Sequence, residues 1–147
     1  MRVRSATVAD LGTVVDLLVE VALGPSDDDA GDVAVYAEAL RSIEASPGSD
    51  VLVAEVDGAV VGVCQLIVFR HLQHRGGLCA EIESVPVCEA LRSQGIGSAL
   101  VSAAVARARE AGCYRVQLTS NNARVDAHRF YERLGFVASH QGFKLLL

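Results

Sequence analysis

The chain has 147 residues, of which 51% are apolar and 21% are charged, and this composition is that of one globular domain with a hydrophobic core. It excludes a largely disordered chain, which would be poorer in apolar residues. The formal net charge of −5 and the low aromatic content of 5% disfavour nucleic acid as a partner, because that partner needs a broad basic face or stacking aromatic side chains.

The first half of the chain predicts a strand followed by two helices. Residues 2–6 form the strand, and Thr7 and Asp10 have the spacing of a capping box at the start of a helix. Apolar residues at helical spacing continue to Ala22, where Gly24-Pro25 ends the helix. The acidic stretch 26–32 lacks the glycine that a calcium-binding loop requires, so it predicts a solvated loop before a second helix over 33–45.

The second half predicts strands that alternate with helices. Residues 50–56 and 59–69 flank an Asp57-Gly58 turn and predict a hairpin. The expected elements that follow are a strand at 78–87, a helix at 95–111, a strand at 114–120, a helix at 126–134 and two short strands at 136–140 and 143–147. This order predicts an α+β or mixed α/β sheet, with its parallel part around the strand–helix–strand unit that contains Gly95.

The sequence predicts neither a membrane segment nor a metal site. The first ten residues hold charges instead of a hydrophobic signal, and the apolar run 59–69 is too short to span a bilayer, so we expect a cytoplasmic protein. The four cysteines form no C-x-x-C pair and are expected to be small buried residues. His71, His74 and Cys79 lack a fourth ligand, and we interpret that region as a polar hairpin tip.

The stretch from Val85 to Leu100 predicts a site for an anion. A strand leads into a turn, and the turn opens a helix at Gly95 and Gly97. The first turn of a helix has unpaired N–H groups and the positive end of the dipole, and glycine lets a ligand approach that backbone closely. Arg92 adds a positive charge at the edge. These features together predict a cradle for a phosphate or a pyrophosphate.

Two nucleotide-binding motifs do not match this cradle. A dinucleotide fingerprint requires a third glycine where Leu100 stands, and an acidic residue after the next strand, where the sequence has Thr119-Ser120-Asn121. A P-loop requires a Gly-Lys-Ser or Gly-Lys-Thr triplet, which is absent. Since a lone G-x-G is a weak signal, a helix that merely begins with glycines stays open on these residues alone.

Three motifs together resemble the GNAT superfamily of acyl-CoA-dependent N-acyltransferases. The segment Arg92-Ser93-Gln94-Gly95-Ile96-Gly97 is similar to the Q/R-x-x-G-x-G/A signature of that family. Residues 82–87 resemble the strand before the signature, and residues 127–136 resemble the C-terminal helix with its Gly-Phe ending. The resemblance implies a single GNAT-like domain over 1–147. Its sheet would be mixed and mostly antiparallel, with about seven strands flanked by four helices, and splayed strands would bind the coenzyme.

The resemblance also implies a binding site for acetyl-CoA as co-substrate. In the family the signature backbone holds the pyrophosphate, and the pantetheine arm pairs with the preceding strand, here through Val85 and Val87 on either side of Pro86. Many members have an asparagine where this chain has Arg124, so Asn121, Asn122 and Arg124 are alternatives for a further contact. The residues assigned to the coenzyme are Val85, Val87, Arg92, Ser93, Gln94, Gly95, Ile96, Gly97, Ser98 and Asn122.

The reaction that the resemblance implies is attack of a neutral amine on the thioester carbonyl. It needs a base for the amine, donors for the oxyanion and an acid for the departing sulfur. Glu81 and Glu83 alternate onto one face of their strand together with Val85 and Val87, and each matches a position used by a general base in the family. Tyr131 matches the tyrosine that protonates the thiolate. Exposed strand carboxylates and a packing role for Tyr131 are the structural alternatives.

We therefore expect an N-acetyltransferase that acts on a primary amine of a small molecule or peptide. A non-catalytic acyl-CoA-binding regulatory module and a plain interaction domain are the alternatives. The acidic composition mildly favours a cationic amine. The apolar last strand, 143–147, would allow pairing in a homodimer.

Overall fold

The structure is a computed structural model that describes all 147 residues, and it confirms the predicted mixed α+β class. Five strands form one sheet in the order β1-β2-β3-β4-β5, antiparallel except for the β4–β5 pair. No helix is both long and apolar enough to cross a membrane. The elements are β1 (Arg2–Ser5), η1 (Val8–Asp10), α1 (Leu11–Glu20), α2 (Val33–Glu44), β2 (Asp50–Val56), β3 (Ala59–Arg70), α3 (Gln73–Gly76), β4 (Leu78–Glu83), η2 (Glu89–Leu91), α4 (Ile96–Glu110), β5 (Cys113–Leu118) and α5 (Val125–Arg133).

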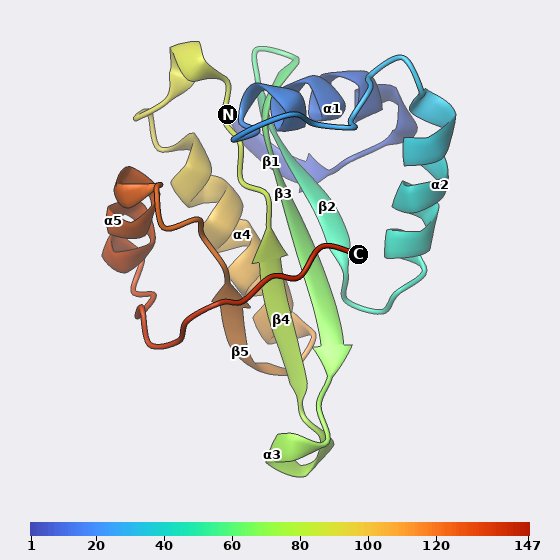
Figure 1. The fold of residues 1–147 in the computed structure, drawn as a ribbon. Coiled ribbons are helices and arrows are strands. Elements are labelled where there is room, and N and C mark those ends of the chain that lie inside the picture. The colour runs from blue at the N-terminus through green and yellow to red at the C-terminus, as the bar shows by residue number, and fades with distance from the viewer.

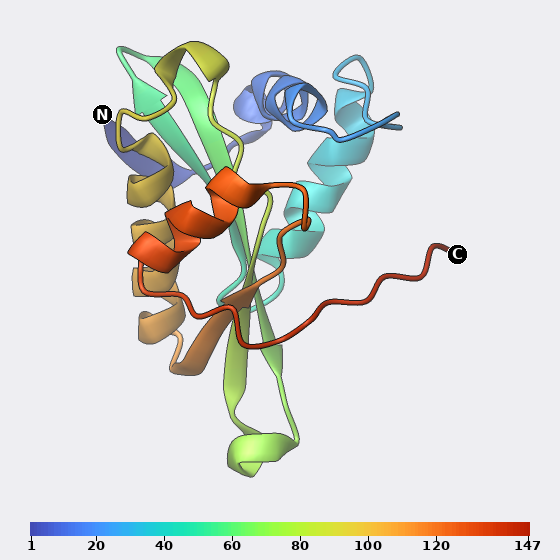
Figure 2. The ribbon, with the colours of Figure 1, turned by 60° about the vertical axis from the view of Figure 1, so that its left-hand side comes forward.

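The helices cover the two faces of the sheet unequally (Figures 1 and 2). Helix α4 packs its buried side chains, among them Leu100 and Ala104, against β2, β3 and β4 on the rear face. Helices α1 and α2 cover only the upper part of the front face, where Leu17 and Leu40 pack on Val53. The lower front face, over β4 and β5, therefore has no helix on it.

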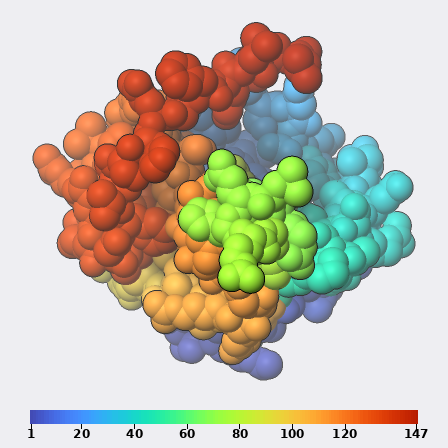
Figure 3. Space-filling view, turned by 90° about the horizontal axis from the view of Figure 1, so that it is seen from below, coloured from blue at the N-terminus to red at the C-terminus, as the bar shows by residue number.

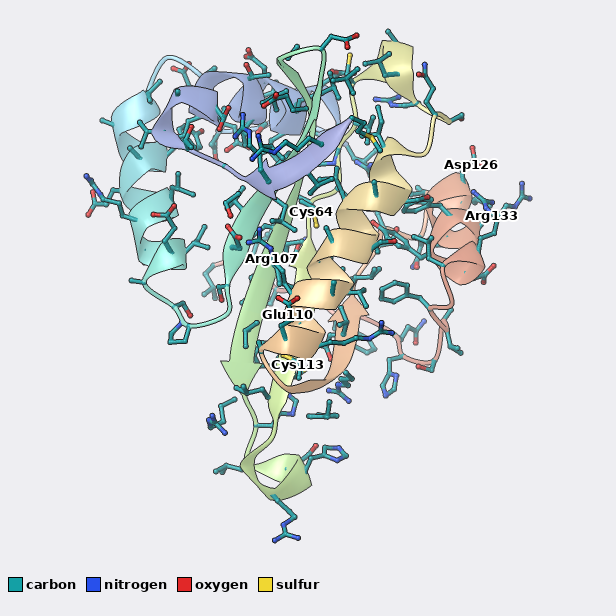
Figure 4. All side chains as sticks on the ribbon, turned by 180° about the vertical axis from the view of Figure 1, so that it is seen from behind. Cys64, Arg107, Glu110, Cys113, Asp126 and Arg133 are labelled. Carbon is teal, nitrogen blue, oxygen red and sulfur yellow. The ribbon has the colours of Figure 1, made fainter.

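Helix α4 is also tied to the sheet by charge. Arg107, seen from behind in Figure 4, pairs with Asp50 at the start of β2 and donates a hydrogen bond to the Ser5 hydroxyl at 3.1 Å. Asp50 is 9% exposed but the Arg107 side chain is 37% exposed, so this ion pair is shielded from water only on the Asp50 side. The contact holds the C-terminal half of α4 in place, and its N-terminal end at Gly95 is thereby directed toward the end of β4.

The two strands predicted at 136–140 and 143–147 are wrong, and this accounts for five strands in place of about seven. The chain after α5 is irregular and crosses in front of β4 (Figure 1). Val137, Phe143 and Leu145 are 81%, 94% and 84% exposed. Apolar, β-favouring residues form a strand only when their backbone pairs with a neighbouring strand, and this segment pairs with none.

The strand predicted over 78–87 ends at Glu83, where Ser84 has a φ of 52°. Before this residue Glu83 pairs with Gln65, and after it Val87 bridges Gly62, so one extra residue has entered the strand as a bulge. A one-residue slip reverses the side-chain faces. Val85 and Val87 consequently pack on the α4 side, and the prediction that they share a face with Glu81 and Glu83 is wrong.

The predicted pairing of Thr7 with Asp10 is confirmed. The Asp10 carboxylate accepts hydrogen bonds from the Thr7 N–H at 2.7 Å and its hydroxyl at 2.8 Å, and from both terminal nitrogens of Arg4 at 2.7 and 2.9 Å. Arg4 also donates to Glu55 of β2 at 2.9 Å. The Arg4 guanidinium, followed by Thr7, holds the pKa of Asp10 well below its ordinary value despite burial. The cluster fastens the start of α1 to the sheet.

We expect Asp10→Asn to lower the free energy of unfolding by about 1–2 kcal/mol at pH 7. Because the folded-state pKa is depressed, this stabilisation is complete above an unfolded pKa of about 4 and is lost as pH falls further. Denaturant unfolding at pH 7 and at about pH 2 should show the difference between parent and variant shrinking in acid. Asp16→Asn, an exposed change on α1, is the control, and an equal effect of the two substitutions would contradict the assignment.

Candidate active site

The pairing of β4 with β5 stops one residue before the end of β4, and the chain then runs on to the signature segment, residues 92–97. The last pair is Ile82 with Leu118. Beyond it the continuation of β4 stays on β3, because Val63 N–H donates to Pro86 C=O at 3.1 Å and Cys88 N–H donates to Val61 C=O at 2.9 Å. An extended backbone segment, residues 85–87, thus lies beside a place that β5 no longer fills.

The free polar groups of this segment face away from β3. Val85 N–H, Val85 C=O and Val87 N–H have no hydrogen-bond partner within the protein. Val87 C=O accepts a hydrogen bond from Arg92 Nε at 3.2 Å, so of the carbonyls of these two valines only Val85 C=O is free. Buried backbone donors and acceptors are rarely left unpaired, and a half-buried strand with three free groups is suited to an added extended ligand.

The start of α4 presents the unpaired amides that the sequence predicts. Backbone N–H groups from Ser93 to Ser98 make no hydrogen bond within the protein, whereas the next one, at Ala99, donates to Gly95 C=O at 3.0 Å. Gly95 has a φ of 83° and Ser93 a φ of 64°, so the loop turns its amides outward. No side chain caps the helix. The positive end of the α4 dipole adds to these donors, and the arrangement fits a pyrophosphate.

The two signature glycines have different steric surroundings. A Cβ on Gly95 would meet nothing within 4 Å, so its positive φ and not crowding favours glycine there. A Cβ on Gly97 would lie 3.3 Å from Phe130 Cζ of α5 and 3.8 Å from Val87 Cγ2. Gly97 therefore packs between Phe130 of α5 and Val87, at the place where the row of free amides meets the free strand backbone.

The side chains around the cradle are less directly placed than its backbone. Arg92 forms an ion pair with Glu20 of α1 at 3.3 Å, in addition to its bond to Val87 C=O, so its guanidinium links the loop to α1. Asn122 is exposed and makes no side-chain hydrogen bond. Asn121 instead organises the turn before α5, accepting from Ala123 N–H at 2.9 Å. Arg124 donates to Val21 C=O at the end of α1.

The two candidate carboxylates lie together on the open front face. Glu81 and Glu83 are both half-buried on β4, and Glu81 Oε2 accepts a hydrogen bond from Gln117 Nε2 at 3.0 Å. Burial, followed by the nearby charge of Glu81, raises the pKa of Glu83, and Lys144 from the C-terminal segment partly opposes this. A carboxylate with a raised pKa is a better proton acceptor near neutral pH than an ordinary one.

Tyr131 of α5 lies near enough to Glu83 to be influenced by its charge. Its ring packs edge-on against Phe130 at 5.0 Å and Phe136 at 5.9 Å between centroids, so it also has the packing role considered above. Burial, followed by the charges of Cys64 and Glu83, raises the pKa of Tyr131, and Arg124 opposes this. The phenol consequently keeps its proton at neutral pH and has it available to donate.

Three further features lie near the carboxylates. A cavity of about 220 Å³ lies between α1, α2 and the sheet, lined mainly by apolar residues but also by Gln65 and Ser84. The C-terminal segment that carries Lys144 runs across the open side with a hollow beneath it (Figure 3). Gln117 was also missed, although the alternation of β5 beside β4 would place its side chain on the face of Glu81.

The chain matches the Acetyltransferase (GNAT) family model over residues 16–136 and belongs to that family. By class it is an N-acetyltransferase. An aminoalkylphosphonate N-acetyltransferase of Salmonella typhimurium is 34% identical over 140 residues, which are 95% of this chain and 87% of that protein.

Two solved structures extend the likeness over the whole fold. A protein from Bacillus halodurans C-125, described as a transcriptional regulator, superposes with a TM-score of 0.91 at 38% identity, covering 99% of both chains. A putative acetyltransferase from Agrobacterium tumefaciens strain C58 superposes with a TM-score of 0.84 at 30% identity over 100% of both chains. The family predicted from the three motifs is thus confirmed.

Proposed function

We propose that this single domain transfers an acetyl group from acetyl-CoA to the primary amine of a small anionic molecule. The observation that carries the proposal is the row of unpaired amides from Ser93 to Ser98, continuous at Gly97 with the free backbone of Val85 and Val87. Acetyl-CoA has a pyrophosphate for the amides and an amide-bearing arm for the strand. When bound, it supplies an activated acetyl group.

In this proposal some residues bind acetyl-CoA and others transfer protons. The amides from Ser93 to Ser98 bind the pyrophosphate, and the Val85 backbone together with Val87 N–H aligns the arm. Glu83 takes the proton from the acceptor amine, directly or through water, and Glu81 is the alternative base. Tyr131 supplies the proton for the departing sulfur. The shifted pKa values of Glu83 and Tyr131 support these roles, since one is a better base and the other stays protonated.

The acceptor is proposed from the relative and from local charge. The Salmonella relative is named for aminoalkylphosphonates, which carry an amine and an anion in one small molecule. Lys144 acts on Glu83 and Arg124 acts on Tyr131, so two cations lie near the proposed proton-transfer groups. Short-range charges outweigh the net charge of −5, which affects only the encounter with the ligand. We therefore favour an anionic amine over the cationic one suggested by composition.

Thiol release from acetyl-CoA in the presence of matched amines tests this function. We expect 2-aminoethylphosphonate to give a kcat/KM at least about 10-fold above that of n-propylamine, and spermidine to be the poorest acceptor, because one charge-assisted contact contributes roughly 1.5–3 kcal/mol. A preference for spermidine would overturn the acceptor class. Tight binding of acetyl-CoA by calorimetry with no thiol release for any amine would contradict the enzymatic role.

A homodimer stays part of the proposal. The exposed apolar side chains of Phe143 and of residues 145–147 support a partner for the C-terminal segment, since such groups are normally covered.

A further inference from the structure

Four side chains on the lower front face form a continuous chain of hydrogen bonds that ends at Glu81. Arg115 Nε lies 3.3 Å from Cys79 Sγ, Cys79 Sγ lies 3.6 Å from Gln117 Oε1, and Gln117 Nε2 lies 3.0 Å from Glu81 Oε2. Cys79 and Glu81 are alternate residues of β4, and Arg115 and Gln117 are their register partners on β5. The parallel strand pair therefore holds the four groups in a fixed row.

Because Arg115 can only donate, each hydrogen bond in the row has a defined donor and acceptor. The Arg115 guanidinium only donates, so the Cys79 sulfur accepts from it and has its own S–H left to donate. That S–H reaches Gln117 Oε1 at 3.6 Å, slightly nearer than the alternative acceptor, Ala80 C=O, at 3.7 Å. The Gln117 amide is then oriented with its NH₂ toward Glu81. The flipped amide would set its oxygen against the Glu81 carboxylate, which is repulsive.

We propose that Arg115, Cys79 and Gln117 are positioning residues that fix a hydrogen-bond donor on the Glu81 carboxylate, so that Glu83, which has no such donor, is the carboxyl group left to exchange a proton. This inference rests on the proposed function, in which Glu83 exchanges a proton with the acceptor amine. Two neighbouring carboxylates release their protons as a pair, and a donor fixed on one of them decides which group keeps the last proton.

Burial raises the pKa of Glu83 independently of this donor, and none of the other groups around the pair donates to Glu81. From β3, the side chains opposite the row are Gln65, Ile67 and Phe69, which are neutral. Tyr131 of α5 is influenced by the charges of Glu83 and of Arg124, which precedes that helix, and Lys144 of the C-terminal segment influences Glu83. Lys144 favours the ionised form of Glu83, which is the opposite effect. The fixed donor on Glu81 comes from Gln117 alone.

Carbon-13 NMR titration of the glutamate carboxyl carbons tests the proposal without acetyl-CoA or turnover. Gln117→Leu removes the donor at similar volume, and we expect the pair to release its protons about half a pH unit to one unit higher than in the parent. Cys79→Ala should shift the pair in the same direction, and Cys79→Ser, which keeps a donor and an acceptor, should restore most of the parental titration. Gln65→Leu, the same substitution on the neighbouring strand β3, should leave the titration of the carboxyl pair unchanged.

A second experiment measures how kcat/KM for the best acceptor falls as pH is lowered, which is the acid limb of the pH profile. We expect Gln117→Leu to move this limb upward with the titration, while the affinity for acetyl-CoA stays within about 2-fold, and to add nothing in a Glu81→Gln background. An unchanged titration in Gln117→Leu, or equal shifts in Gln65→Leu, would overturn the proposal, as would a shifted titration with an unmoved acid limb. A parent protein that releases no thiol with any amine would instead refute the proposed function, because the titration is read independently.

Discussion

Gly97→Leu should weaken the binding of acetyl-CoA by about 100-fold or more. The Cβ would already lie 3.3 Å from Phe130 Cζ and 3.8 Å from Val87 Cγ2, so the isobutyl group beyond it has to push aside these side chains or the ligand. Gly97 lies between the proposed amide cradle and the free strand backbone. A ligand displaced there loses at least one or two charge-assisted hydrogen bonds, each contributing roughly 1.5–3 kcal/mol.

Calorimetry with acetyl-CoA measures this effect, and two further substitutions make it specific. Gly12→Leu is the matched control, because Gly12 is also the second residue of a helix and has nothing within 4 Å of its Cβ position. Gly97→Ala should lose only a few-fold, since the edge of the Phe130 ring can shift by a few tenths of an ångström. Unaltered affinity in a folded Gly97→Leu protein would mean that the coenzyme does not pass this point, and the proposed binding site would be wrong.

Glu83→Gln should lower kcat by about 100-fold or more, the range expected when a general base is lost. Its binding constant for acetyl-CoA should stay within about 2-fold, because the side chain lies on the opposite face of the strand from Val85 and Val87. Since the pKa of Glu83 is raised, the parental rate should fall as pH drops through a value above that of an ordinary glutamate. This acid limb should be absent from Glu83→Gln.

Pre-steady-state or steady-state rates against pH distinguish the roles within the site. Tyr131→Phe keeps the ring packing with Phe130 and Phe136, and we expect a loss of about 10-fold in kcat with a weaker alkaline limb. Glu81→Gln is the comparison for Glu83→Gln. A larger loss in Glu81→Gln would make Glu81 the base, and parental rates in both variants would leave water as the proton acceptor.

The amino-acid sequence predicted the central elements of the fold because their signals are local. The Asp57-Gly58 turn, the apolar stripe of α1 and the glycines at both ends of α4 each act within a few residues, and the elements appear where expected. The cradle is equally local, since six neighbouring amides and a helix dipole need no distant residue. Family membership followed from three such motifs in order.

What failed was whatever depended on a partner distant in the sequence. The segments 136–140 and 143–147 have strand composition, but composition provides no neighbouring backbone to pair with. The bulge at Ser84 reversed the faces of Val85 and Val87, because side chains alternate along a strand and one inserted residue moves all later ones to the opposite face. The sequence also held no sign that Arg92 pairs with Glu20 of α1, because that partner lies 72 positions away; its contact with a phosphate stays a prediction.

Local sequence was therefore enough to predict a row of free backbone amides at the start of a helix, the feature on which the proposed anion site rests. Which side chains lie around that row depended on how the chain folds. Register between β4 and β5 brings Gln117 to Glu81, and the fold brings Tyr131 and Lys144 near Glu83. Backbone geometry and helix dipoles are set by residues within one or two turns of each other. In contrast, pKa values and rows of hydrogen bonds depend on groups far apart in the sequence that only folding brings together.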